Sequence, residues 1–331
     1  EMCIRDRFTT VPQQFFEDSL PASFSYYQVN TDIGLVQKSA FTEDLDATLK
    51  CIDEFLPFDA PTVSGLARSI TQNRCHLILC DIAPLGIAVG HQSGIPTVLI
   101  ENFTWDSIYA GYSEMAAVMG HQIDYLRQMF AAADHRIQTD PVCFQHNSDL
   151  SVGPVSRQFK SNRTEIRQQL RIPMSQKAVL ISTGGISERY RFIDSLASFR
   201  EACFILPGGS QSIEFRDNVI LLPHHSNYYH PDLVNACDVI IGKAGYSTIA
   251  EVYAAGVPFG YVPRKHYPET PGLVDFIEKN IDGLALGTED FNSGRWIDDL
   301  PRLMAMPRRQ RCEGNGSSQI AAYIVRAIDA I

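Results

Sequence analysis

Glycines and hydroxyl side chains follow a short apolar run in the last third of the chain. Residues 238–241 can form a buried strand, Gly242 and Gly245 interrupt it, and Ser247 and Thr248 precede apolar residues at helical spacing. The first N–H groups of a helix have no partner inside the helix, and the helix dipole places about half a positive charge there. The segment therefore predicts a strand, a turn and a helix start that can bind a phosphate-sized anion.

Two familiar nucleotide motifs do not fit this segment. A nucleoside triphosphatase loop is excluded because Cys237 stands where the first glycine is needed and Ala244 where Ser or Thr would hold magnesium. The dinucleotide fingerprint G-x-G-x-x-G is absent. Thr248 and Glu251 also have the spacing of a capping box, which is worth roughly 1 kcal/mol to a helix. Capping and ligand binding both stay open for these two residues.

A second glycine turn begins the same half of the chain. The apolar run 178–182 is followed by Thr183, Gly184 and Gly185. A Gly-Gly pair alone indicates little, but two such turns would suit the two phosphates of a diphosphate.

Polar residues follow two apolar runs in the first half of the chain. The run 76–82 contains Asp81, and the run 95–100 is followed by Asn102, Trp105 and Asp106. Two strands around a helix predict a parallel sheet, whose ligands bind outside the carboxyl ends of the strands. Asp81 could act in a functional site at this edge of the sheet, or it could cap the next helix. Trp105 could stack on a sugar or belong to the core.

Residues 245–251 resemble the donor-binding motif of two-domain nucleotide-sugar glycosyltransferases, such as the peptidoglycan N-acetylglucosaminyltransferase and the UDP-glucosyltransferases. In that family a Gly-x-Ser/Thr-Thr turn contacts the diphosphate, and a Glu one helical turn later holds the ribose. The resemblance assigns the phosphate role to Ser247 and Thr248 and the ribose role to Glu251. The chain is more similar still to the glycosyltransferase-like domain fused to some plant arabinose kinases, which has a similar Gly-Lys-x-Gly-Tyr run.

The resemblance implies the glycosyltransferase-B fold, an α/β architecture of two Rossmann-like, doubly wound domains facing across a cleft. Residues 1–153 would form the acceptor-side domain and residues 154–331 the donor-binding domain, with the last helix packing back on the first. Residues 1–7 read as an artefact rather than a protein start, and we set them aside. We expect the N-terminal domain to be truncated, so that its first strand, turn and helix are missing.

The implied function is transfer of a sugar from a nucleotide diphosphate donor, expected to be a UDP-sugar, to an unknown acceptor hydroxyl without a metal or cofactor. The family's usual base is a histidine in the part that we expect to be missing, which leaves Asp81 and Asp106 as candidates. Asn102 and Trp105 are assigned to the acceptor side. The expected donor-binding residues are Gly184, Gly185, His224, Lys243, Gly245, Tyr246, Ser247, Thr248, Glu251 and Glu269.

Three other functions stay open. An epimerase or hydrolase of sugar nucleotides would need acid and base groups but no acceptor pocket. A regulatory protein would bind the nucleotide sugar without turnover. A dehydrogenase is disfavoured by the missing dinucleotide fingerprint.

Composition narrows the range of partners and locations. The 331 residues carry a net charge of -10 with no block of like charges, which argues against nucleic acid. No run of 18 apolar residues could span a bilayer, although contact with a membrane surface stays open. The eight cysteines form no C-x-x-C pair, and we expect free thiols and a cytoplasmic location. His224, His225 and His230 lack further ligands at a matching spacing, so no metal site is predicted.

Overall fold

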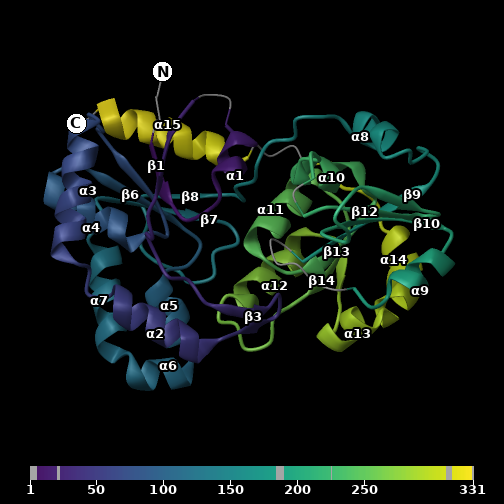
Figure 1. Ribbon diagram of the computed structural model, residues 1–331, viewed down its shortest axis with the longest axis horizontal. Coiled ribbons are helices and arrows are strands. Elements are labelled where there is room, and N and C mark those ends of the chain that lie inside the picture. Colours follow the sequence, from purple (N-terminus) through teal and green to yellow (C-terminus); the bar gives the residue numbers. More distant parts are fainter. Residues whose placement is uncertain (1–5, 21–22, 184–189, 225, 311–314, 330–331) are drawn as a thin grey trace.

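The computed structural model describes residues 6–20, 23–183, 190–224, 226–310 and 315–329, and its two halves lie side by side in Figure 1. The elements of the first half are β1 (Asp6–Thr9), α1 (Gln13–Glu17), β2 (Ser25–Gln28), β3 (Gln37–Ser39), β4 (Thr42–Glu43), α2 (Leu45–Phe55), α3 (Ala60–Gln72), β5 (Ile78–Asp81), α4 (Pro84–Ser93), β6 (Thr97–Glu101), α5 (Trp105–Ala110), α6 (Ser113–Val118), α7 (Gly120–Ala131), β7 (His135–Thr139) and β8 (Leu150–Val152).

The elements of the second half begin after a connecting segment. They are α8 (Arg163–Gln169), β9 (Lys177–Ser182), α9 (Ile193–Ser198), β10 (Ala202–Pro207), β11 (Glu214–Arg216), β12 (Val219–Leu222), α10 (His230–Ala236), β13 (Val239–Lys243), α11 (Tyr246–Ala255), β14 (Phe259–Val262), α12 (Thr270–Asn280), β15 (Gly283–Ala285), α13 (Thr288–Ser293), the 3₁₀ helix η1 (Arg295–Asp299), α14 (Leu300–Met304) and α15 (Gly316–Asp329).

The main sheet of the first half is parallel, with the order β5-β6-β7-β8. One face packs on α3 and α4 through a cluster that includes Ile70 and Val89. The other face is covered by α15, whose Ile320 and Ile324 join Val98 in one apolar cluster. Coverage of both faces explains why β5 and β6 read as continuous apolar runs.

The first two strands stand apart from that sheet. β1 and β2 form a separate parallel pair, with Asp6 opposite Ser25 and Arg7 opposite Tyr26. Asp6 and Arg7, set aside in the sequence analysis, are therefore part of this strand pair.

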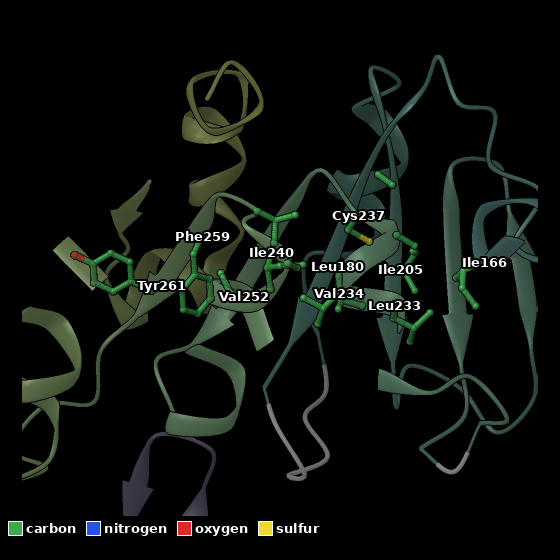
Figure 2. Packing of buried hydrophobic residues seen from close by; sticks show 14 of the residues in the cluster. Ile166, Leu180, Ile205, Leu233, Val234, Cys237, Ile240, Val252, Phe259 and Tyr261 are labelled. Atoms are coloured by element: carbon green, nitrogen blue, oxygen red, sulfur yellow. The ribbon is translucent and has the colours of Figure 1, made fainter. Parts of the chain in front are cut away.

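The second half contains a seven-stranded sheet with the order β11-β12-β10-β9-β13-β14-β15, in which β11 alone runs antiparallel. Alternate residues of β9 enter different clusters, Leu180 on one face and Val179 and Ile181 on the other. Figure 2 shows the first cluster, where Leu180, Ile205 and Ile240 from neighbouring strands meet residues of the covering helices. Strand order reverses between β9 and β13, which places a crevice at their carboxyl ends.

The last helix, α15, returns from the second half to the first and contacts β8 there (Figure 1). The predicted division at residues 153 and 154 falls in the segment between β8 and α8. Six described cysteines have free thiols: Cys51, Cys75, Cys80, Cys143, Cys203 and Cys237. None of the helices in the described ranges is long and apolar enough to cross a membrane.

Candidate functional site

A cavity of about 1840 Å³ opens where the two halves face each other and extends into the first half. Its wall includes the last residues of β5, β6, β7, β9 and β10, which is the edge where open parallel sheets bind ligands. The predicted site residues that line the cavity are Asp81, Asn102, His224, Tyr246, Ser247, Thr248 and Glu251.

The start of α11 faces this cavity. Gly245 is its N-cap residue in an extended conformation, and no side chain of the described chain caps the helix. Ser247 is exposed and Thr248 is buried, and both hydroxyl residues line the cavity. The capping-box interpretation is wrong, because Thr248 lies inside the helix rather than at its N-cap. Within the part of the chain that the structure describes, the N–H groups of the first turn therefore have no capping side chain.

Glu251 lies one turn further along α11 and is almost fully buried at the cavity wall. Arg157 Nη2 lies 2.9 Å from its Oε1, and His230 Nδ1 lies 2.7 Å from its Oε2. Burial alone would raise the pKa of Glu251, but these hydrogen bonds and charges outweigh it and lower the pKa. Arg157 Nε also lies 3.3 Å from Oε1, so that oxygen already has two donors, whereas Oε2 can accept a further hydrogen bond from a ribose hydroxyl.

His230 is a site residue that sequence reasoning missed. It begins α10, directly before Pro231, and its other ring nitrogen lies 3.0 Å from Ser182 Oγ at the end of β9. Ser182, His230 and Glu251 thus form one chain of polar contacts along the cavity wall. A histidine at a helix start after a strand is a weak signal, and the residues it joins are far apart in sequence.

Tyr246 connects the two halves at the cavity. Its hydroxyl donates to Thr139 Oγ1 at 2.9 Å, and the backbone N–H of Val155 donates to the same hydroxyl at 3.2 Å. Because the first residue of α11 is held by the first half, the anion-binding turn has a defined position relative to β7.

Lys243 and Glu269 do not line the cavity. Glu269 is buried, accepts a hydrogen bond from Asn102 Nδ2 at 3.1 Å and pairs with Arg264 at 3.3 Å. Arg264 also reaches Glu43 of the first half at 3.3 Å. Burial and the positive charge of Arg264 lower the pKa of Lys243 to about 8, although the charges of Glu269 and Glu43 oppose this shift. The structure places these predicted donor contacts in a polar cluster that joins the halves.

Asp81 is an acidic residue of the cavity wall. It ends β5 and is exposed to the cavity, while protein surrounds it on its other sides. This desolvation and the negative charge of Asp32 raise the pKa of Asp81 to about 6. Asp32, a second residue that the sequence did not indicate, also lines the cavity and accepts a hydrogen bond from Trp105 Nε1 at 2.9 Å.

Trp105 and Asp106 lie behind the cavity wall rather than in it. The Trp105 ring stacks on Tyr109 with centroids 5.8 Å apart, so its observed contacts are with the core and with Asp32. Asp106 is buried and lies 3.7 Å from Arg127 Nε. As a base, Asp106 is therefore less accessible than Asp81.

Glu101 is a further acidic residue of the wall that the sequence did not indicate. It ends β6, and burial raises its pKa to about 7. The predicted residues Gly184, Gly185 and His225 lie outside the described residues. Among the described residues, no group of three His, Cys, Asp or Glu side chains is arranged to hold a metal ion.

Comparison with known proteins places this geometry in context. No family model matches the chain. It is 27% identical over 306 residues to the L-arabinokinase of Arabidopsis thaliana, covering 90% of this chain and 29% of that protein. It is also 24% identical over 211 residues to the UDP-N-acetylglucosamine–N-acetylmuramyl-(pentapeptide) pyrophosphoryl-undecaprenol N-acetylglucosamine transferase of Halalkalibacterium halodurans. That match covers 58% of this chain and 55% of that protein. The chain thus spans less than a third of the first relative and about half of the second.

Solved structures agree with the fold. MurG of Acinetobacter baumannii has a TM-score of 0.55 at 16% identity, covering 95% of this chain and 88% of its own. CalG4, the calicheamicin glycosyltransferase, has a TM-score of 0.60 at 15% identity, and the match covers 98% of this chain and 90% of CalG4. UGT89C1 of Arabidopsis thaliana, complexed with quercetin, has a TM-score of 0.63 at 12% identity, and the match covers 97% of this chain and 90% of UGT89C1. The predicted resemblance and the glycosyltransferase-B fold are confirmed.

Proposed function

We propose that this protein transfers a sugar from a nucleotide diphosphate donor, a UDP-sugar, to an acceptor hydroxyl. The observation that carries the proposal is the uncapped start of α11. Its N–H groups, Ser247 and Thr248 face a cavity between two Rossmann-like halves, with Glu251 one turn further on. One solved structure of the same fold is that of UGT89C1 complexed with UDP, which supports the choice of nucleotide.

The leaving diphosphate determines what the second half must do. Cleavage of the bond between sugar and phosphate places negative charge on the diphosphate, and preorganised donors lower the barrier by roughly 3 kcal/mol each. The first-turn N–H groups of α11 and the hydroxyls of Ser247 and Thr248 are the donors in the described part of the wall. Glu251 would hold the ribose through the lone pair of Oε2 that His230 leaves open.

The acceptor hydroxyl needs a base, and we assign that role to Asp81. A carboxylate with a pKa near 6 is ionised at neutral pH and still basic enough to take a proton as the new bond forms. Asp32 contributes by its charge, which keeps the pKa of Asp81 raised. Asn102, which also lines the cavity, would contact the acceptor.

A screen of nucleotides by thermal shift tests the donor. The protein is incubated with UDP, UDP-glucose, UDP-N-acetylglucosamine, GDP-mannose and NAD, and we expect stabilisation by the uridine compounds alone. Stabilisation by NAD alone would favour a dehydrogenase and contradict the proposal.

Product analysis tests the reaction. The UDP-sugar that binds is incubated with a panel of hydroxyl acceptors and, separately, with water as the only acceptor. We expect a glycosylated acceptor. Release of free sugar or an epimer at the same rate without acceptor would identify a hydrolase or epimerase, and binding without turnover in every mixture would identify a regulatory protein.

A further inference from the structure

The Glu251 carboxylate is already occupied by protein donors on most of its acceptor positions. A carboxylate has about four lone-pair positions, two on each oxygen. Arg157 donates to Oε1 from Nη2 at 2.9 Å and from Nε at 3.3 Å, and His230 Nδ1 lies 2.7 Å from Oε2. One position, on Oε2, is left for a ligand, whereas the 2′- and 3′-hydroxyls of a ribose need two.

The side chain of Arg157 is held in place by more than Glu251. Its guanidinium lies 4.7 Å from the ring centroid of Phe15 in the first half and 5.0 Å from that of Tyr229 in the second. Cation–π contacts with two rings add to a charge-assisted hydrogen bond. A ribose hydroxyl that displaced Arg157 would also leave the buried Glu251 carboxylate without its cation, which is strongly destabilising. We therefore expect Arg157 to stay on Oε1 when a nucleotide binds.

The backbone on both sides of Arg157 is anchored as well. Before it, the Val155 N–H donates to the Tyr246 hydroxyl at 3.2 Å. After it, the Lys160 N–H donates to Asp232 Oδ1 at 2.8 Å. These two anchors belong to α11 and α10, so the segment that carries Arg157 is tied to the helices that also carry Glu251 and Tyr229's neighbours.

His230 is fixed at both ring nitrogens. Because a carboxylate only accepts hydrogen bonds, Nδ1 of His230 carries a hydrogen in either protonation state of the ring. Nε2 lies 3.0 Å from Ser182 Oγ, so rotation of the ring away from Oε2 would break both contacts. Oε2 therefore keeps this donor and retains a single open position.

The open position lies on the side of the cavity where we place the diphosphate. His230, which holds Oε2, contacts Ser182 at the end of β9, and the close approach of Gly242 to Ser182 shows that β9 and β13 end side by side. The start of α11 follows β13 directly, whereas Oε1 faces Arg157 and Phe15 of α1. The 3′-hydroxyl is one bond closer to the 5′-phosphate than the 2′-hydroxyl, so it is the hydroxyl that meets Oε2.

We propose, on the basis of the sugar transfer proposed above, that Glu251 binds the donor ribose through its 3′-hydroxyl alone, so that nucleotide sugars of 2′-deoxyribose fit this site as well as those of ribose. Arg157 determines this tolerance, because its two N–H groups fill Oε1. A site that hydrogen-bonds a substrate hydroxyl strongly rejects the analogue that lacks it, whereas a hydroxyl without a protein partner brings no such discrimination.

Calorimetry with UDP, 2′-deoxy-UDP and 3′-deoxy-UDP tests the proposal. We expect the Kd of 2′-deoxy-UDP to lie within about threefold of that of UDP. The Kd of 3′-deoxy-UDP should be at least about 10-fold higher, because it lacks a hydrogen bond to a charged group.

Arg157→Lys tests which residue sets the tolerance. A lysine keeps the positive charge but offers one nitrogen in place of two, so one position on Oε1 becomes open to the 2′-hydroxyl. We expect 2′-deoxy-UDP to bind this variant at least about fivefold more weakly than UDP does. Arg295→Lys, which changes an exposed pair with Asp290 on η1, is the matched control and should keep the original ratio.

Three results would overturn the proposal while UDP still binds. They are a loss of 10-fold or more with 2′-deoxy-UDP in the unaltered protein, equal binding of 3′-deoxy-UDP and UDP, and an unchanged ratio in a folded Arg157→Lys protein. Each of these would leave the proposed sugar transfer standing. Absence of binding by all three nucleotides would instead overturn the proposed sugar transfer, and this inference with it.

Discussion

At the scale of single residues, the site depends on groups whose charge is set by their neighbours. Glu251 is kept ionised by Arg157 and His230, although burial opposes that charge. The pKa of Asp81 shifts in the opposite direction, upward, because burial and the negative charge of Asp32 both disfavour its ionised form. The Glu251 carboxylate therefore suits permanent hydrogen bonding, and the Asp81 carboxylate suits proton transfer near neutral pH.

Replacing Glu251 by alanine tests its role with the nucleotide. We expect UDP to bind about 10- to 100-fold more weakly in calorimetry, because hydrogen bonds to a charged group contribute about 1.5–3 kcal/mol. Glu165→Ala removes an exposed carboxylate on α8 and should leave UDP affinity unchanged. Unaltered affinity in a folded Glu251→Ala protein would reduce Glu251 to a structural partner of Arg157 and His230.

Replacing Asp81 by asparagine tests the base. We expect kcat to fall about 100-fold or more, with UDP affinity preserved, because a general base contributes about that factor. Asp53→Asn, an exposed change on α2, should leave kcat unchanged. If Asp81→Asn transferred sugar at the original rate, the base would have to be another group.

The pH dependence follows from the raised pKa of Asp81. Only its ionised form can accept a proton, so kcat/KM should increase with pH up to about 6 and level off above it. Asp32→Asn removes the like charge that raises this pKa, so the acidic limb of the profile should move to lower pH. A limb that stayed in place in Asp32→Asn would show that the two carboxylates are not coupled.

Metal removal separates donation by N–H groups from metal-assisted transfer. We propose that the start of α11 stabilises the diphosphate, so EDTA should change UDP affinity less than twofold and added Mg²⁺ or Mn²⁺ should not increase the rate. A large loss of binding in EDTA, restored by a divalent ion, would contradict this expectation. The same titration with Glu251→Ala shows whether any metal effect depends on that carboxylate.

At the scale of elements, close contact between strands positions the anion-binding turn. A Cβ on Gly242 of β13 would lie 1.8 Å from the carbonyl oxygen of Ser182 in β9. Glycine at this position lets the two strands end side by side, which brings the start of α11 next to Ser182. The glycine spacing in the sequence thus reflects strand packing as well as ligand approach.

Gly242→Ala tests that packing. We expect a loss of about 3 kcal/mol or more in urea unfolding, at the upper end of overpacking costs, because the backbone of β9 cannot move aside like a flexible side chain. Gly153→Ala is the matched control, since a Cβ there would meet nothing within 4 Å. Equal stability of the two variants would mean that β9 and β13 can separate without cost.

At the scale of the whole molecule, buried charges join the two halves beside the cavity. Arg264 pairs with Glu43 of the first half and Glu269 of the second, and Asn102 donates to Glu269. The Tyr246 hydroxyl adds a second connection through Thr139. These contacts hold the halves in one relative position, and the shape of the cavity depends on that position.

Arg264→Met tests the connection. We expect a loss of about 3–5 kcal/mol, because Glu43 and Glu269 would be left as uncompensated buried carboxylates. Adding Glu43→Gln and Glu269→Gln to the same protein should recover much of the loss. Lys279→Met, which breaks an exposed pair with Asp275, should change stability by less than about 0.5 kcal/mol. Similar losses in Arg264→Met and Lys279→Met would show that the buried cluster does not hold the halves together.

The sequence by itself determined the features that depend on neighbouring residues. The apolar run before Gly242 and the helical spacing after Ser247 predicted β13 and α11, because strand and helix periods and glycine turns are local properties. The same reasoning predicted a parallel sheet around β5 and β6, and the resemblance of residues 245–251 predicted the fold.

Only the tertiary structure decided which distant side chains meet. Arg157 and His230 reach Glu251, Asp32 approaches Asp81, and Glu269 turns to Asn102 rather than to the cavity. The capping box failed for a local reason, because α11 begins at Tyr246 and Thr248 lies inside the helix rather than at its N-cap. The distant pairings depend on how two sheets are placed relative to each other, and no short-range pattern in the chain carries that information.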